Sequence, residues 1–451
     1  MPKNIYNDII KRQPFLGIEK EKRSMGNLPG LKPPAWIDDG PVYEVFVRNF
    51  SKAGNFAGVK EKIPYLKDLG IKTVWLMPVH PIGKKGRKGN LGSPYAIRDH
   101  LAINPEYGDE NDLRELVRSI HKAGMRIIID LVINHAARDH VLTRSTPGIF
   151  MRDTQGLFTR KIADWSDVID FDYSRKETRN YMLDVVLYWI REFDIDGYRC
   201  DVAGMVPLDF WEEATERILR LKPDLFMLAE WQRPALHRKS FHSTYDWVTY
   251  FILKEIYRGN RPAVDIVQWV KQRKSLLPRN ARPLCFTENH DFPRTLKIFG
   301  KNSFHPFAAM IFTMPGIPLI YNGQEIGAQK SVSLFDKDTI EWDDQNSQVF
   351  NFYRDLIHLR RENKAFATEE MEIVKNDHPE HVVTFIKSSP GNRVLGMINF
   401  GTRKQEIEIK LPALYHKHNW QDLLNSGMIK TGEELKRVDL KPYGFLFWKE
   451  I

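Results

Sequence analysis

The stretch Asp196-Gly197-Tyr198-Arg199-Cys200-Asp201-Val202-Ala203 is the one around which the rest of this chain is organised. Its Asp-Gly pair predicts a turn, and residues 198–202 predict a short buried strand. Arg199 and Asp201 are two positions apart, so on a strand their side chains point to the same side. An ion pair among apolar neighbours costs free energy unless something offsets that cost. The pair is therefore either a structural ion pair or part of a functional site.

Strand-like and helix-like segments alternate along the chain on both sides of this stretch. The predicted strands are residues 42–47, 73–77, 126–132, 198–202, 225–229, 245–247 (the weakest), 284–286 and 318–321. The predicted helices between them are residues 58–69, 110–123, 181–193 and 209–221. Strand, helix, glycine and strand in succession are typical of βαβ units with a parallel sheet. Eight such strands over about 320 residues favour an α/β fold of the (β/α)8 TIM-barrel type over an open sheet.

The length of 451 residues predicts more than one domain. Residues 1–40 form an irregular N-terminal lead-in, and residues 41–364 form the barrel. Residues 136–174, after the third strand, form a small inserted subdomain. Residues 365–451 contain segments with strand character (372–374, 382–386, 394–400, 405–409 and 444–448) joined by turn residues. They predict a C-terminal antiparallel β-sandwich domain.

Composition limits the compartment and the partners. The hydrophobic fraction of 42% predicts large cores, and no apolar run is long enough to span a bilayer. Residues 1–23 lack the features of a signal peptide, so we expect a cytoplasmic protein, or a secreted one if a leader was removed. The two cysteines, Cys200 and Cys285, predict buried thiols rather than a disulfide framework.

The net charge of +9 raises the possibility of nucleic-acid binding. The densest basic cluster, Lys84-Lys85-Gly86-Arg87-Lys88, has no interleaved aromatic residues, and the other basic residues are mixed with acidic ones. Solvated surface is the better interpretation. We therefore expect neither a nucleic-acid partner nor a membrane partner, and the oligomeric state stays open.

Polar residues follow four of the predicted strands. Residues 130–135 contain Asp130, Asn134 and His135, Glu230-Trp231 follow the fifth strand, and residues 287–291 end in His290 and Asp291. Active sites of parallel barrels lie at the C-terminal ends of the strands. Four polar strand ends therefore predict one active site, with Arg199 and Asp201 as part of it.

Asp201 and Glu230 end adjacent predicted strands, which lie about 4.8 Å apart in a sheet. Their carboxyl groups should then be roughly 5 Å apart, the separation used in retaining glycoside hydrolysis. Arg199 should keep Asp201 ionised, as a nucleophile must be. Glu230 has no such partner in the sequence, and a nearby anion should raise its pKa, as suits a general acid.

The remaining polar residues suit a sugar substrate. Asp291 could stabilise a cationic transition state or bind ring hydroxyls, and His135 and His290 are neutral donors suited to sugar hydroxyls. A metal site is the competing use of these residues, but they lack the close histidine spacing of common metal sites.

These four segments, in their order and spacing, resemble the conserved regions of the α-amylase superfamily of glycoside hydrolases. The resemblance covers the chain after about residue 40. It implies the following roles: Asp201 as nucleophile, Glu230 as acid/base, Asp291 as transition-state stabiliser, Arg199, His135 and His290 as sugar-contacting residues, and Tyr95 as the ring that stacks on the cleaved sugar. The implied activity is retaining hydrolysis of α-1,4-glucosidic bonds in starch, maltodextrins or maltooligosaccharides, which would be the substrate partners.

The chain also departs from that pattern. Many α-amylases have a Lys-His pair after the nucleophile segment, where this chain has Gly204-Met205, and residues 51–55 replace an acidic calcium loop. Asn134 resembles a common calcium ligand. We therefore expect no required cofactor, with a structural calcium near Asn134 as the one possible metal. With no charged donor at residues 202–205, Trp231 should bind the acceptor sugar by stacking.

Three alternatives stay open. The segment around Asp201, together with Phe210-Trp211, looks closer to cyclomaltodextrinases and neopullulanases. A transglycosylase of the same fold would use the same residues and pass the sugar to another sugar instead of water. A non-catalytic interaction module is disfavoured, because such relatives typically lack catalytic carboxylates and all three are present here.

Overall fold

The computed structural model describes residues 24–451 apart from 343–346, 416–418, 425–427 and 430–436. Residues 1–23 of the expected lead-in, and the expected absence of a signal peptide, lie outside the described residues. The described part of the lead-in ends in a short 3-10 helix, Ala35–Asp39, directly before the first strand.

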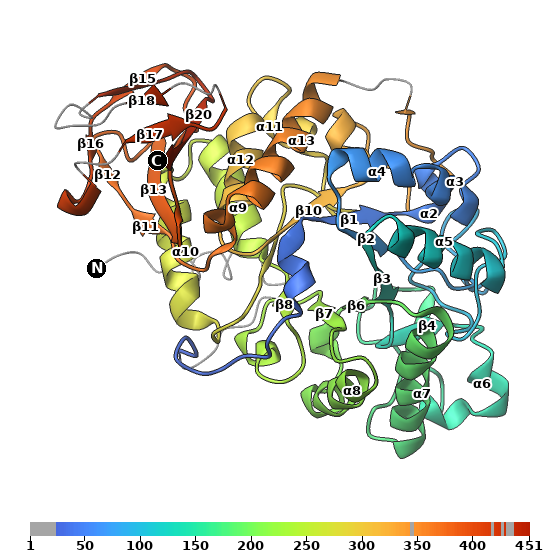
Figure 1. Cartoon of the computed structure of the whole chain (residues 1–451). Helices are drawn as coiled ribbons and strands as arrows, with labels where there is room; N and C mark the ends of the chain where they lie inside the picture. The colour runs from blue at the N-terminus through green and yellow to red at the C-terminus, as the bar shows by residue number, and fades with distance from the viewer. Residues whose placement is uncertain (1–23, 343–346, 416–418, 425–427, 430–436) are drawn as a thin grey trace.

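Eight parallel strands form the centre of the molecule (Figure 1). They are β1 Val42–Val45, β2 Thr73–Leu76, β3 Arg126–Leu131, β6 Gly197–Cys200, β7 Phe226–Ala229, β8 Ser243–Thr244, β9 Leu284–Cys285 and β10 Ile317–Tyr321. Their order in the sheet is β8-β7-β6-β3-β2-β1-β10-β9. A parallel bridge between Tyr245 and Leu284 joins the two end strands, so the sheet closes. The predicted (β/α)8 barrel is confirmed.

Helices surround the barrel, and their apolar side chains are buried in the same hydrophobic core as those of the strands. They are α2 Val47–Phe50, α3 Phe56–Glu61, α4 Ile63–Leu69, α5 Glu110–Lys122, α7 Lys176–Phe193, α8 Leu208–Leu221, α9 Trp247–Tyr257, α10 Val264–Leu276, α11 Thr295–Phe299, α12 His305–Thr313 and α13 Ser347–Glu362. In α5 the buried positions Leu113, Leu116, Val117 and Ile120 recur at helical spacing. The side chain of Asp109 caps its first turn, and Asp112 completes the capping box.

The sixth strand lies earlier than predicted. It is β8, Ser243–Thr244, whereas Trp247 is the first residue of helix α9. The Asp246 carboxylate accepts a hydrogen bond from the Thr249 backbone N–H (3.1 Å), so it caps the helix. A helix N-cap at this position ends the strand, although the Tyr-Asp-Trp sequence looks strand-like.

The turn before β6 also differs from the prediction. The left-handed residue is Asp194 (φ 53°), which ends α7. Asp196 already pairs with β3, since its N–H donates to the Ile127 carbonyl oxygen (2.7 Å). Gly197 is the first strand residue, and a Cβ there would lie 2.4 Å from the Phe226 carbonyl oxygen. The glycine therefore allows close strand approach rather than a turn.

Two further boundaries differ near the start of the barrel. The first strand ends at Val45, and Val47 begins helix α2 instead of ending the strand. The predicted helix 58–69 divides at Lys62 into α3 and α4. Pro64 lies in the first turn of α4, where its missing N–H leaves no helical bond unmade.

The inserted subdomain is built on two short antiparallel strands. They are β4 His135–Ala137 and β5 Val168–Asp170, with His135 opposite Asp170. A single turn of helix, α6 Leu142–Ser145, lies between them. The subdomain thus begins at a predicted site residue, and its structure bears directly on that residue's position.

The C-terminal part contains a six-stranded antiparallel sheet of order β11-β13-β14-β20-β17-β18 and two strand pairs, β12-β16 and β15-β19. The strands are β11 Glu372–Ile373, β12 Lys375–Asn376, β13 Val382–Ser389, β14 Asn392–Asn399, β15 Gln405–Ile407, β16 Ile409–Lys410, β17 Trp420–Asp422, β18 Met428–Ile429, β19 Val438–Leu440 and β20 Phe445–Glu450. Phe385 and Phe447 belong to the barrel's hydrophobic core, whereas Trp420 and Trp448 belong to a second core. The predicted β-sandwich is confirmed, except that the segment 405–409 divides between two strand pairs.

Among the residues that the structure describes, none of the helices has both the length and the apolarity needed to cross a bilayer.

Candidate active site

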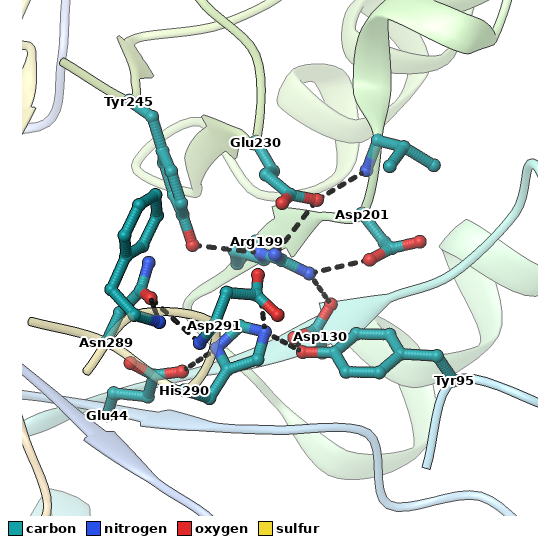
Figure 2. Close-up of polar contacts among 12 residues, drawn as sticks. Glu44, Tyr95, Asp130, Arg199, Asp201, Glu230, Tyr245, Asn289, His290 and Asp291 are labelled. Carbon is teal, nitrogen blue, oxygen red and sulfur yellow. Dashed lines mark hydrogen bonds and ion pairs between the residues drawn. The ribbon is translucent and has the colours of Figure 1, made fainter. Parts of the chain in front are cut away.

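The Arg199 guanidinium lies at the centre of the predicted site and is completely buried (Figure 2). Nη1 lies 2.8 Å from Asp130 Oδ1 and 3.0 Å from Asp201 Oδ1. Nη2 lies 3.0 Å from Glu230 Oε2. One cation from β6 therefore contacts a carboxylate near the end of β3 and the carboxylates that directly follow β6 and β7, and so joins three strand ends.

Aromatic rings surround the same guanidinium. Its central carbon lies 5.2 Å from the ring centroid of Trp75, 5.6 Å from that of Tyr95 and 5.7 Å from that of Tyr245. Arg199 Nε also donates a hydrogen bond to the Tyr245 hydroxyl (3.2 Å). Ring faces stabilise a desolvated cation, so these residues keep Arg199 charged away from water. The sequence did not identify Tyr245 as a site residue.

Asp201 and Glu230 lie at adjacent strand ends, as predicted. Cys200 and Ala229 are paired residues of β6 and β7, so the next residue of each strand is a carboxylate. Glu230 is not without partners, however, because Arg199 contacts it and the Val202 backbone N–H donates to its Oε2 (2.9 Å). The prediction of an unpartnered Glu230 is wrong, since chain spacing does not show a contact between neighbouring strands.

Val202 has a left-handed backbone (φ 36°, ψ 46°), which is unfavourable for a β-branched residue. This conformation accompanies the hydrogen bond from its N–H to Glu230. Backbone strain of this kind persists where the surroundings over-determine it, and it is concentrated at functional sites.

Burial raises the pKa of both Asp201 and Glu230 to about 7, although Arg199 acts in the opposite direction. The charges of Asp201 and Asp291 raise the pKa of Glu230 further. Arg199 lowers the pKa of Asp201, but burial raises it by more, so the prediction that Arg199 keeps this carboxyl group ionised is wrong. Several carboxyl groups around one cation cannot all ionise easily, so the pair favours one proton and one charge near neutral pH.

His290 is charged rather than neutral. Burial alone would lower its pKa, but the carboxylates of Asp291 and Glu44 outweigh that effect and raise the pKa to about 9. Nδ1 pairs with Glu44, and Nε2 lies 3.3 Å from Asp291 Oδ2 and 2.8 Å from the Tyr95 hydroxyl. The prediction of a neutral donor is therefore wrong. Glu44 was missed, although its sequence signal is visible as one carboxylate inside an apolar strand.

His135 is neutral, as predicted, because burial lowers its pKa to about 4. Its Nε2 lies 4.0 Å from Asp201 Oδ2, and its ring centroid lies 5.1 Å from that of Trp165 in the inserted subdomain. The two histidines of the site therefore differ in charge.

A cavity of about 220 Å³ lies above these groups. Its lining comprises Lys88, Ser93, Tyr95, His135, Trp165, Asp167, Val168, Asp201, Val202, Glu230, His290, Asp291, Leu334 and Phe335. It brings together six of the predicted residues, with Arg199 buried behind Asp201 and Glu230. Aromatic and apolar walls with a few carboxylates and imidazoles suit a sugar, which has apolar faces and a polar edge.

The structure bears on two further predictions about residues near the cavity, Lys88 and Trp231. Lys88, expected in a solvated loop, donates to the Asp164 carbonyl oxygen (3.0 Å) and lies 3.4 Å from Asp167 Oδ1, so it reaches the inserted subdomain. Trp231 packs on Gly204, where a Cβ would lie 2.0 Å from the indole ring. Trp231 is not among the described residues that line the cavity, so its acceptor role stays a prediction.

The surroundings of Asn134 do not fit a calcium ion. The Lys161 ammonium lies 3.3 Å from Asn134 Oδ1, the oxygen that a metal would need. The Asn134 amide nitrogen lies 3.2 Å from His135 Nδ1. Within the described residues, no cluster of three or more His, Cys, Asp or Glu side chains could hold a metal. Calcium prefers carboxylate and carbonyl oxygens, and here a cationic side chain already contacts the candidate oxygen.

Two models of known protein families match the sequence of this chain. A family model described as the alpha amylase catalytic domain matches residues 39–147 and 154–343. A model described as the maltogenic amylase C-terminal domain matches residues 371–447. The two models cover the barrel and most of the C-terminal sheet.

Solved structures and curated sequences give the same result. A noncanonic maltogenic alpha-amylase, AmyB from Thermotoga neapolitana, is similar with a TM-score of 0.86 at 32% identity, over 92% of this chain and 99% of that one. An alpha-amylase from Lactobacillus plantarum is similar with a TM-score of 0.84 at 33% identity, over 92% and 100%. A cyclomaltodextrinase from Geobacillus thermopakistaniensis is 25% identical over 98% of this chain and 77% of its own length. The chain spans 58% of the length of the alpha-amylase MalA of Haloarcula japonica.

The raised pKa of Asp201 predicts a pH-dependent cost in stability. The folded protein keeps this proton up to about pH 7, whereas the unfolded chain releases it near 3.8, so stability falls as pH rises from about 4 to 7. Asp201→Asn removes that cost. We expect the melting temperature of the variant minus that of the parent to increase between pH 4 and 7 and then level off. Each kcal/mol should appear as about 1 °C in a chain of 451 residues, because the entropy of unfolding grows with chain length.

The control for this measurement is Asp184→Asn, which changes an exposed carboxylate of α7. The melting temperature of Asp184→Asn minus that of the parent should not increase between pH 4 and 7. A difference for Asp201→Asn that stays constant from pH 4 to 8 would contradict the raised pKa.

Proposed function

The chain belongs to the α-amylase family of glycoside hydrolases, and from this premise we propose that it hydrolyses α-1,4-glucosidic bonds with net retention of configuration. The proposed substrates are starch, maltodextrins or maltooligosaccharides. The observation that carries the proposal is the contact of Arg199 with Asp201 on one nitrogen and Glu230 on another, at adjacent strand ends beside a sugar-sized cavity.

In this proposal Asp201 is the nucleophile and Glu230 the acid/base. The Asp201 carboxylate attacks the anomeric carbon, and Glu230 gives its proton to the leaving glycosidic oxygen. The resulting carboxylate of Glu230 then takes a proton from water, whose oxygen attacks the anomeric carbon and releases Asp201. The coupled pKa values near 7 suit this exchange, because one proton and one charge are what the first step requires.

Asp291 is the proposed transition-state stabiliser. Its carboxylate lines the cavity and is 45% exposed before substrate binds, so a sugar can reach it. Tyr95 presents a ring beside it, stacked on His290 with centroids 5.5 Å apart. A carboxylate next to a sugar that becomes an oxocarbenium ion lowers the free energy of the transition state more than that of the substrate.

We also propose the domain division expected from the sequence, with a catalytic barrel at 41–364 and a sandwich domain at 365–451. A cytoplasmic location and action without a required cofactor are part of the same proposal. An intracellular maltogenic amylase of Bacillus subtilis is among the relatives, at 26% identity.

The second candidate is a cyclomaltodextrinase or neopullulanase type of hydrolase, or a transglycosylase of the same fold. Its support is the similarity to proteins that carry the first two names, such as neopullulanase 2 of Thermoactinomyces vulgaris at 24% identity. Product analysis separates these activities, because the same carboxylates serve all of them.

The catalytic roles are tested by two conservative substitutions. Asp201→Asn should abolish nearly all turnover of maltooligosaccharides. Glu230→Gln should do the same, but it should retain activity on glycosides with an activated leaving group, which need little acid assistance. Circular dichroism spectra should match the parent, since neither change alters the strands. Near-parental activity of either variant on maltooligosaccharides would show that the roles are misassigned.

The stereochemistry of the reaction is a separate prediction. Carboxylates on one guanidinium at adjacent strand ends leave little room for an attacking water between nucleophile and sugar. The first product should therefore be the α-anomer, observed by proton NMR before mutarotation. Initial formation of the β-anomer would rule out double displacement.

A product profile is the measurement that decides the substrate range. Val202, Gly204 and Met205 offer no charged donor to an acceptor sugar. We expect internal cleavage of starch, with maltose and maltotriose accumulating and isomaltose nearly inert. Glucose as the only early product, or isomaltose as the best substrate, would contradict this acceptor site. Cyclodextrin or pullulan cleaved faster than starch would favour the second candidate.

A further inference from the structure

Lys161 connects the inserted subdomain to the barrel. Its backbone N–H donates to Asp170 Oδ2 (2.7 Å) within the subdomain. Its ammonium reaches out to Asn134 Oδ1 and to the Met205 carbonyl oxygen, each at 3.3 Å. Asn134 follows β3, and Met205 ends a 3-10 helix that follows β6. One side chain therefore contacts two loops that carry predicted site residues.

The Lys161 contact decides how the Asn134 amide is oriented. An ammonium group can only donate hydrogen bonds, so it selects the amide oxygen of Asn134 as its partner. The amide nitrogen must then face the other neighbour, His135 Nδ1, at 3.2 Å. Because that nitrogen donates, His135 Nδ1 accepts, and in a neutral imidazole the proton is then on Nε2.

This tautomer matters because Nε2 is the ring atom nearest the nucleophile. It lies 4.0 Å from Asp201 Oδ2, and His135 lines the cavity. An N–H group directed toward a carboxylate and an incoming sugar hydroxyl is favourable. The opposite tautomer would present a lone pair to the carboxylate and would lose the donor for the hydroxyl.

We propose that Lys161 is a positioning residue that acts through Asn134 to hold His135 as the Nε2–H tautomer, and that its ammonium supplies the positive charge which the family resemblance assigned to calcium. The activity readouts below rest on the proposed function, whereas the spectroscopic and thermal readouts do not. Lys161 itself is exposed, so its contacts are screened and the expected effects are moderate.

Three substitutions of Lys161 separate charge from size. Lys161→Arg keeps a donor and should preserve the tautomer. Lys161→Met keeps the length and removes the donor, so Asn134 loses its preferred orientation. Lys161→Glu replaces the donor with an acceptor, which selects the amide nitrogen of Asn134 and turns its oxygen toward His135 Nδ1. That oxygen can only accept, so Nδ1 must carry the proton.

The direct readout is ¹⁵N NMR of the full chain labelled at histidine, with His135 assigned by comparison with His135→Gln. The parent and Lys161→Arg should show a protonated Nε2, and Lys161→Glu a protonated Nδ1. On maltooligosaccharides, kcat/KM should fall about tenfold for Lys161→Glu, equivalent to about 1.4 kcal/mol. The fall should be smaller for Lys161→Met, and Lys161→Arg should stay near the parent. Lys404→Met, which breaks a surface ion pair with Asp439 in the C-terminal sheet, is the matched control and should change neither readout.

The metal part of the proposal is tested by thermal unfolding of the parent with EDTA and with added calcium. The melting temperature should be the same in both, because the Lys161 ammonium already contacts the oxygen in question. An unchanged His135 tautomer in Lys161→Glu would overturn the positioning role. A melting temperature that falls with EDTA and recovers with calcium would overturn the replacement of the metal. If the NMR result holds while the parent has no glucan-cleaving activity, the proposed function fails and the positioning role stands.

Discussion

The site depends on the burial of one guanidinium. Removing Arg199 from water would cost several kcal/mol if its charge were unmatched. Its match comes from Asp130, Asp201 and Glu230, which three neighbouring barrel strands supply. These contacts form only when the three strands are in register, so the charge balance and the barrel geometry require each other. Burial raises the pKa of Asp201 and Glu230, and one guanidinium supplies too little positive charge for all the carboxyl groups, so a proton stays in the site near neutral pH.

The sequence predicts the members of this site better than their contacts. The rule that functional residues follow parallel strands needs only the strand order, and it placed Asp201, Glu230, His135 and His290 at one edge. The Arg199–Asp201 contact was also predictable, because the two residues are two positions apart and so point to the same side of an extended chain. The contacts of Arg199 with Glu230 and of His290 with Glu44 join different strands. Spacing along the chain carries no information on which inward side chains meet across a barrel.

The errors in the predicted strand and turn boundaries have a local cause. Residues 245–247 look like a strand by residue type, yet Asp246 caps a helix there. Asp196 looks like a turn residue, but its backbone and carboxylate both pair with Ile127 in β3. Asp can cap, turn or pair with a neighbouring strand, and its partners decide among these uses. Lys161 is a similar case, since an exposed lysine in an insertion gives no sign in the sequence that it contacts Asn134.

The two histidines show how surroundings set chemistry that residue type leaves open. His290 is cationic, and a cation beside a developing oxocarbenium ion would oppose catalysis. Here the Glu44 carboxylate on one ring nitrogen and the Asp291 carboxylate near the other neutralise it. His290 can thus donate to a sugar hydroxyl without adding net positive charge to the cavity. The Asp201 carboxylate lies 4.0 Å from His135 Nε2, beyond hydrogen-bond distance, and burial keeps His135 neutral. Its usefulness as a donor therefore depends on which nitrogen carries the proton. The charge of His290 is therefore compensated by two carboxylates, whereas the tautomer of His135 is proposed to depend on the hydrogen bonds that link it through Asn134 to Lys161.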